Sequence, residues 1–122
     1  MPYSDASSLH RTIDTILTHA ESLNAVPKKD LEFGDRVLVT TAHSVYSIYT
    51  LEDRRYLVSG GWFDRQGLSP VKLEISGCTW GGSAIKADIM AACGLHLEFG
   101  NGVVTSRIRK LEVIRCEGKR TN

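Results

Sequence analysis

One stretch of the sequence combines glycines, hydroxyl side chains and an aromatic side chain within eight residues. It runs Ser76-Gly77-Cys78-Thr79-Trp80-Gly81-Gly82-Ser83. Because glycine adopts backbone conformations that other residues avoid, free N–H groups in such a stretch can form a concave anion site, to which the side chains of Ser76, Thr79, Trp80 and Ser83 would contribute. The alternative is a barrel corner, in which the hydroxyls bond to local backbone and the tryptophan covers the core. The stretch matches no phosphate-loop motif.

Two arginines near the C-terminus form a second candidate binding surface. Residues 106–122 carry six basic and two acidic side chains. We expect Arg107 and Arg109 to lie on one strand face with Thr105, where aligned arginines can bind phosphate groups. The alternative is an edge strand whose charges prevent sheet-to-sheet association. Only Tyr46, Tyr49, Trp62 and Trp80 could stack on bases, and the sequence does not place them on this face, so nucleic acid is not an expected partner.

Nucleophilic catalysis needs a nucleophile, a base and an orienting group. Cys78 is available as a nucleophile, and His43 and His96 are available as bases. No local signature surrounds any of them, and the histidines lack the spacing of metal ligands. No two carboxylates have a spacing typical of an acid–base catalytic pair either. We therefore expect neither a metal nor a cofactor, and an enzyme using His43 or Cys78 is the third of three functional alternatives.

The totals indicate a single globular domain. The chain has 122 residues, of which 42% are hydrophobic and 24% are charged, and its net charge is +1. Its first residues have no signal-peptide pattern, and no apolar run is long enough to span a membrane. The three cysteines form no disulfide framework or metal motif. These features predict a cytoplasmic protein with reduced thiols that does not bind membranes.

Apolar residues at spacings of three and four predict an amphipathic helix over residues 5–25. Val26-Pro27 would end this helix, because proline disfavours helix in the residue before it. We therefore assign residues 1–27 to an N-terminal helix, which would cover one end of a barrel or pack on a second copy of the chain.

Residues 33–116 are predicted to form short strands. Alternating or β-branched patterns indicate strands over residues 36–41, 44–51, 56–59, 71–76, 85–89, 95–99 and 103–114. The dipeptide Asn101-Gly102 is a strong hairpin signal, and a change of phase in the last strand predicts a bulge near Arg109-Lys110. Trp62 and Phe63 are assigned to a loop, and residues 117–122 to a flexible tail. The predicted fold is mainly β: a small antiparallel barrel of about six to seven strands with one N-terminal amphipathic helix.

Part of the chain resembles the second half of PilZ domains, which are small barrels that bind cyclic dinucleotides. The similarity lies in Glu74-Ile75-Ser76, Gly81-Gly82, Ala84-Ile85 and Gly94-Leu95-His96-Leu97-Glu98. The family's motif has aspartate where Glu74 stands, a shorter spacing to the glycine, and a preceding pair of arginines four apart that is missing here. Residues 33–113 also resemble small uncharacterised bacterial proteins, which implies a bacterial β-barrel unit without an assigned activity.

These observations predict a non-enzymatic binding or interaction module that forms homo-oligomers. Its candidate surface is the Gly-rich stretch Ser76–Ser83 with Arg107 and Arg109. The first alternative is a sensor domain for an anionic small molecule or nucleotide.

Overall fold

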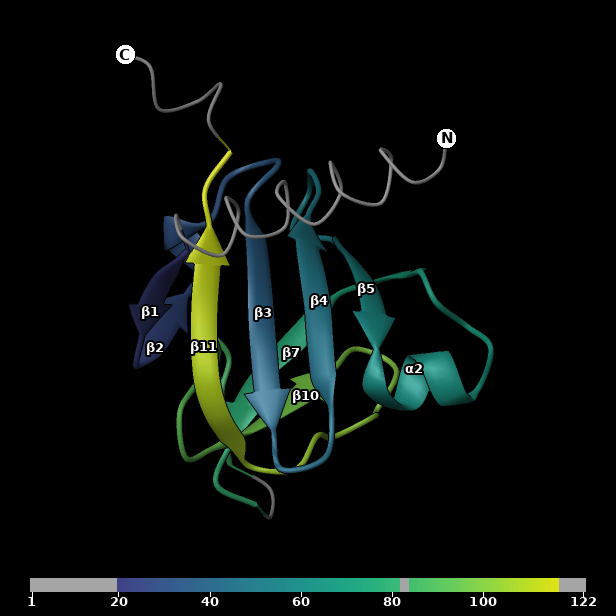
Figure 1. Ribbon diagram of the computed structural model, residues 1–122. Coiled ribbons are helices and arrows are strands. Elements are labelled where there is room, and N and C mark those ends of the chain that lie inside the picture. Colours follow the sequence, from purple (N-terminus) through teal and green to yellow (C-terminus); the bar gives the residue numbers. More distant parts are fainter. Residues whose placement is uncertain (1–19, 82–83, 117–122) are drawn as a thin grey trace, which may run out of the picture.

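Short antiparallel strands make up most of the fold, and they form three sheets (Figure 1). The computed structural model describes residues 20–81 and 84–116 of the chain. Across the largest sheet, the order is β1 (Glu21–Leu23), β11 (Ile108–Ile114), β3 (Arg36–Thr41), β4 (Val45–Thr50), β5 (Tyr56–Gly60) and β6 (Val71–Leu73). The second sheet holds β10 (His96–Phe99), β7 (Ile75–Thr79) and β8 (Ile85–Lys86), and the third pairs β2 (Ala25–Pro27) with β9 (Ile89–Ala92). Two short helical segments, η1 (Lys28–Asp30) and α2 (Gly61–Arg65), complete the described elements.

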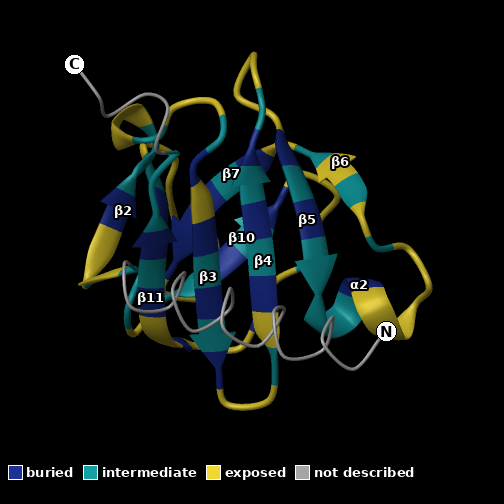
Figure 2. Ribbon diagram, turned by 45° about the horizontal axis from the view of Figure 1, so that its top comes forward, coloured by how far each residue is buried: buried dark blue, intermediate teal, exposed yellow. Residues whose placement is uncertain are grey.

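The core lies between the six-stranded sheet and the shorter strands behind it. Figure 1 shows β7 and β10 crossing behind β3 and β4, and Figure 2 shows buried and less buried residues alternating along these strands. Period-two alternation places Val37 and Val39 of β3 inside, and Leu97 and Phe99 of β10 meet them from the other layer. Phe63 of α2 joins this core, with its ring centroid 4.9 Å from that of Phe99.

The alternating segments predicted several strands correctly. The structure confirms strands at residues 36–41, 45–50, 56–60 and 96–99. It also confirms the bulge in the last strand, because the register of β11 against β3 shifts between Ile108 and Lys110. Strand β11 begins at Ile108, however, and not at Val103 as predicted. Residues 100–102 form the expected turn, with the Gly102 N–H donating to the Phe99 carbonyl (2.9 Å).

The prediction of a closed barrel is wrong for the described residues, because no ladder of hydrogen bonds joins the three sheets into one. The six-stranded sheet ends at β1 on one side and at β6 on the other. The chain leaves this sheet at Glu74, which separates β6 from β7 and whose carbonyl accepts from the Gly100 N–H (2.7 Å). The next strand, β7, pairs with β10 and β8 only, so the fold is layered.

The predicted N-terminal helix is wrong at its C-terminal end. Residues 21–23 form β1, which pairs with Leu111–Val113 of β11, and residues 25–27 form β2, which pairs with β9. Leu23 fits the predicted helical stripe, yet it packs against the core from a strand, because pairing with a distant strand overrides local periodicity. Residues 1–19, which carry the rest of that helix, and the predicted tail 117–122 lie outside the described residues.

The predicted loop at Trp62 and Phe63 is instead the short helix α2. The Gly60 N–H donates to the Asp64 carboxylate (3.0 Å), which secures the first turn of this helix. None of the helices in the described part of the chain is long and apolar enough to cross a membrane.

Candidate functional site

The first half of the Gly-rich stretch is a strand, not a turn. Residues Ser76 to Thr79 belong to β7, which pairs with β10 and β8. Gly77 has a φ of +143°, and a Cβ at this position would overlap the backbone carbonyl of Lys86 in β8. Glycine is therefore required here by the close approach of two strands, which is a packing role.

The second half of the stretch is the turn after β7. The Gly81 N–H donates to Thr79 Oγ1 (3.1 Å), so two of the groups expected to bind an anion bond to each other. That bond fits the interpretation of this stretch as a corner, but Trp80 is 53% exposed and does not cover the core. Gly82 and Ser83 lie outside the described residues.

The two candidate arginines do not share a strand face. Arg107 precedes β11, and its Nη1 donates to the Gly94 carbonyl (2.8 Å). Arg109 is the extra residue at the bulge of β11. It lines a shallow hollow with Cys93 and Ser22, and no residue of the Gly-rich stretch lines that hollow.

The residues proposed for catalysis occupy structural positions. Cys78 is buried in β7, and burial raises the pKa of its thiol, which reduces its nucleophilicity at neutral pH. His43 lies in the exposed turn between β3 and β4, and His96 Nδ1 is 2.8 Å from the Thr105 carbonyl oxygen. In the described part of the chain, no group of three or more His, Cys, Asp or Glu residues could hold a metal ion.

A different region holds a cavity of about 410 Å³, which we name the Lys28 pocket. Three segments form its walls: the end of β2 with η1 and the residues after it, the end of β4 with the β4–β5 turn and the start of β5, and the turn before β9. Figure 2 shows the β4–β5 turn as an exposed projection at one end of the molecule. The lining residues are Pro27, Lys28, Lys29, Leu31, Phe33, Thr50, Leu51, Asp53, Arg54, Tyr56 and Asp88.

Cationic groups approach one another in this pocket. Partial burial lowers the pKa of the Lys28 ammonium, and the neighbouring Arg54 guanidinium lowers it further, against the opposing effect of Glu74 and Asp88. Two like charges close together favour binding of an anion, because the anion offsets their repulsion. Burial raises the pKa of the Tyr56 phenol, which stays protonated at neutral pH.

Thr50 lines this pocket, and its hydroxyl has no hydrogen-bond partner among the described residues. The residue is only 5% exposed, and its Oγ1 is the buried side-chain polar atom that stays unsatisfied among the described residues. Its backbone is fully used, since its N–H donates to the Asp35 carbonyl (2.8 Å) and its carbonyl accepts from the Gly34 N–H (2.9 Å). A buried hydroxyl left without a partner costs about 1–3 kcal/mol. Oγ1 itself has almost no accessible surface, so the Thr50 side chain would have to rotate before a ligand atom in the pocket could supply that partner.

The turn that carries Arg54 has an uncommon backbone. Asp53 and Arg54 have φ values of +60° and +58°, and the Arg55 N–H donates to the Glu52 carbonyl (3.3 Å) across them. Both central residues of this mirror-image turn are left-handed, a conformation that glycine and asparagine adopt more readily than arginine. Such strain is frequent at ligand sites. Here it places the Asp53 and Arg54 side chains at the rim of the pocket.

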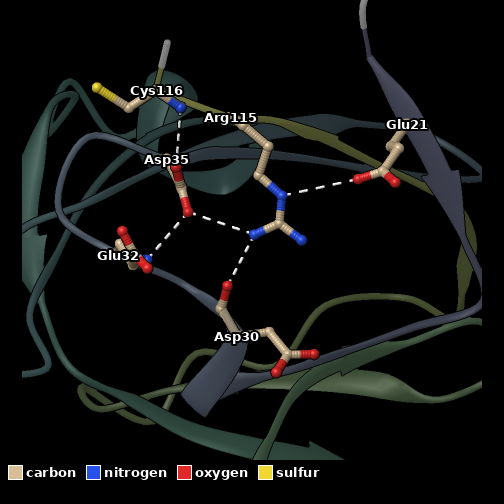
Figure 3. A network of polar contacts seen from close by, with 6 residues as sticks. All are labelled: Glu21, Asp30, Glu32, Asp35, Arg115 and Cys116. Atoms are coloured by element: carbon tan, nitrogen blue, oxygen red, sulfur yellow. Dashed lines mark hydrogen bonds and ion pairs between the residues drawn. The ribbon is translucent and has the colours of Figure 1, made fainter. Parts of the chain in front are cut away.

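A network of polar contacts surrounds the buried Asp35 carboxylate, next to the segment that carries Lys28 and Lys29 (Figure 3). Arg115 Nη1 donates to the Asp30 carbonyl (2.7 Å) and to Asp35 Oδ2 (3.3 Å). The buried Asp35 carboxylate also accepts from the backbone N–H groups of Glu32 (3.0 Å) and Cys116 (2.9 Å). The end of β11 is thereby tied to the segment that carries Lys28 and Lys29, so Arg115 and Asp35 position the pocket without lining it.

No family model matches this chain, and neither a curated protein nor a solved structure is significantly similar to it. The case for a function therefore depends on the geometry of the site.

Sequence reasoning missed every residue of the Lys28 pocket. From the sequence alone, Lys28-Lys29-Asp30 is a short polar linker and Glu52-Asp53-Arg54-Arg55 is a charged hairpin turn, and neither indicates a binding site. The sequence contained one usable signal, a pair of lysines directly after Val26-Pro27, but nothing in it indicated that this pair lies beside a turn more than 20 residues away.

Proposed function

We propose that this protein is a non-enzymatic binding module whose Lys28 pocket takes a small anionic molecule. The observation that carries the proposal is the buried, unpartnered Thr50 hydroxyl in a wall shared with Lys28 and Arg54. Buried polar groups are nearly always hydrogen-bonded, and the exceptions often mark a ligand site. This assignment replaces the Gly-rich stretch as the favoured binding surface and agrees with the first alternative drawn from the sequence, a sensor for an anionic molecule.

Electrostatics support the sign of the ligand charge. Partial burial and the neighbouring Arg54 guanidinium disfavour the charged form of Lys28, whereas an anion between the two side chains would favour it. The neutral Tyr56 phenol, another lining residue, is a donor suited to an anionic oxygen. An enzymatic role has less support, since the Cys78 thiol is buried with a raised pKa.

Titration of the ¹⁵N-labelled protein with sodium phosphate at constant ionic strength tests the proposal. We expect amide shifts to concentrate at residues 28–33, 50–56 and 88, and Arg54→Gln to remove most of them. Arg55→Gln is the matched control, because Arg55 belongs to the same turn but does not line the Lys28 pocket; it lines the adjacent hollow with Lys72 and Glu74. Absence of saturable shifts at these residues, or equal loss in both variants, would refute the proposal.

Self-association is a second candidate function, supported by exposed apolar side chains on either side of the β7–β8 turn. Trp80 is 53% exposed and Ile85 is 40% exposed, and β8 is a two-residue strand at the edge of its sheet. Exposed apolar residues at a sheet edge favour pairing with another chain. Light scattering after size exclusion should show a dimer that Trp80→Glu converts to a monomer; a monomeric wild type would end this proposal. The cytoplasmic location and bacterial origin expected from the sequence stay predictions.

A further inference from the structure

The wall of the Lys28 pocket is not uniformly charged. Pro27, Leu31, Phe33 and Leu51 line it together with the ionic groups. Leu31 is partly buried and packs against the core. Phe33 is 46% exposed, and its ring makes an edge contact with the ring of Tyr49, with the two centroids 6.3 Å apart. A hydrated inorganic anion would leave this apolar surface in water. A ligand with an apolar portion would cover it, which is favourable in proportion to the area buried.

The ionic groups limit the charge of the ligand. The lining holds three cationic side chains, Lys28, Lys29 and Arg54, and two carboxylates, Asp53 and Asp88. The cations outnumber the carboxylates by one, so the pocket can neutralise a single acidic group but would repel a chain of several. Electrostatic complementarity of this kind selects among ligands more than it adds affinity.

The size of the cavity agrees with a small organic ligand. Sites for small molecules usually have volumes of roughly 300–1,000 Å³ and are lined mainly by apolar groups with a few placed polar ones. A volume of about 410 Å³ lies at the lower end of that range. It accommodates one acidic group and one ring-sized body.

We infer that the natural ligand class is an organic anion in which one acidic head group is joined to a compact apolar or aromatic body. The head group lies between Lys28 and Arg54, where a rotation of the Thr50 side chain would bring its hydroxyl within reach, and the body lies against Phe33, Leu31 and Leu51. This inference rests on the proposed function and specifies its ligand.

Calorimetric titration with three probes tests the inference and the proposed function separately. The probes are phenyl phosphate, inorganic phosphate and phenol, which present head and body together, the head alone and the body alone. We expect phenyl phosphate to bind at least about tenfold more tightly than either part. Equal affinity for phenyl phosphate and inorganic phosphate would overturn this inference and leave the proposed function intact. Binding of phenol as tight as that of phenyl phosphate, or binding of none of the three, would overturn both.

A pair of variants assigns the gain to the apolar wall. Phe33→Ala should lower the affinity for phenyl phosphate by about tenfold and leave that for inorganic phosphate unchanged. Leu68→Ala is the control, because Leu68 is 47% exposed, about the same as Phe33, but does not line the pocket. An unchanged affinity of Phe33→Ala for phenyl phosphate, or equal losses for both probes, would contradict the inference.

Discussion

Replacing Thr50 with valine should make the free protein more stable and its ligand complex weaker. Valine has nearly the shape of threonine but no hydroxyl, so the substitution removes the unsatisfied buried Oγ1 and little else. An unsatisfied buried polar group costs about 1–3 kcal/mol, and we expect most of that cost to be regained. For a domain of this size, a gain of about 1–2 kcal/mol raises Tm by roughly 3–10 °C.

The same substitution should weaken ligand binding. A hydrogen bond to a charged group contributes about 1.5–3 kcal/mol, so we expect the affinity for phenyl phosphate to fall by roughly 10- to 100-fold. Urea unfolding with and without phenyl phosphate measures both effects in one experiment, because a ligand that binds only the native state raises the free energy of unfolding.

Thr41→Val is the matched control for this experiment. Thr41 is also a buried threonine at the end of a strand, but its Oγ1 accepts from the Ser44 N–H (3.2 Å) and lies 3.3 Å from the Ser44 carbonyl oxygen. Its replacement should therefore destabilise the protein by about 1–2 kcal/mol, the opposite sign. If Thr50→Val destabilises the free protein as Thr41→Val does, or binds phenyl phosphate as tightly as the wild type, the role assigned to Thr50 is wrong.

Three further predictions follow from the packing and the ionic contacts. Gly77→Ala should destabilise the protein by at least about 2 kcal/mol in urea unfolding, because the new methyl group would overlap the backbone of β8; a loss under ~0.5 kcal/mol would contradict that packing. A hydrogen bond from the Ser69 hydroxyl, with a smaller contribution from the Gly60 N–H, lowers the pKa of Asp64 below its ordinary value of 3.8. The unfolded chain therefore binds a proton at higher pH than the native protein, and the stability contributed by Asp64 is present above pH 3.8 and lost as the pH falls through the native pKa. Asp64→Asn should therefore reduce the fall in the free energy of unfolding at acid pH. An unchanged fall in the variant would contradict the role given to Asp64. Arg115→Gln should lower the free energy of unfolding by about 1–3 kcal/mol, because Asp35 keeps its backbone donors but loses its cation. The same substitution should weaken phosphate binding. Unchanged binding would show that the network does not position the pocket.

Local patterns in the sequence predicted the strands well where a strand has one solvent-facing side and one buried side. Val37 and Val39 alternate with less buried residues, and the period of two was sufficient to place β3. The phase change near Arg109 likewise revealed the bulge, because a bulge changes which residues face the core. Such signals are local, so they can be read without knowing the partner strand.

Features that depend on distant partners could not be read in this way. The stripe containing Leu23 suited a helix, but β1 exists because its backbone pairs with β11, about 90 residues later in the chain. The barrel does not close among the described residues, because β6 and β7 belong to different sheets and the chain passes from one to the other at Glu74. No residue type in the sequence marks that point. In each case a long-range ladder of hydrogen bonds decides the structure.

The binding pocket was hidden for the same reason. Lys28, Thr50 and Asp88 are far apart in the sequence, and each has an ordinary local explanation as a linker, strand or turn residue. The left-handed conformation of Arg54 could not be predicted either, because glycine or asparagine is the usual sequence signal for that conformation. In the Gly-rich stretch, by contrast, a conspicuous composition arose partly from the packing of Gly77 on β8.

The most direct test of the central claim is the position of a bound anion. Crystals soaked in sodium selenate, whose selenium scatters anomalously, would locate the anion without assuming its contacts. We predict an anomalous peak in the Lys28 pocket, with selenate oxygens within hydrogen-bond distance of Thr50 Oγ1 and of the Lys28 or Arg54 side chain, and loss of this peak in crystals of Arg54→Gln. An empty Lys28 pocket with selenate bound instead at Trp80–Gly81 or at Arg107 would contradict the account.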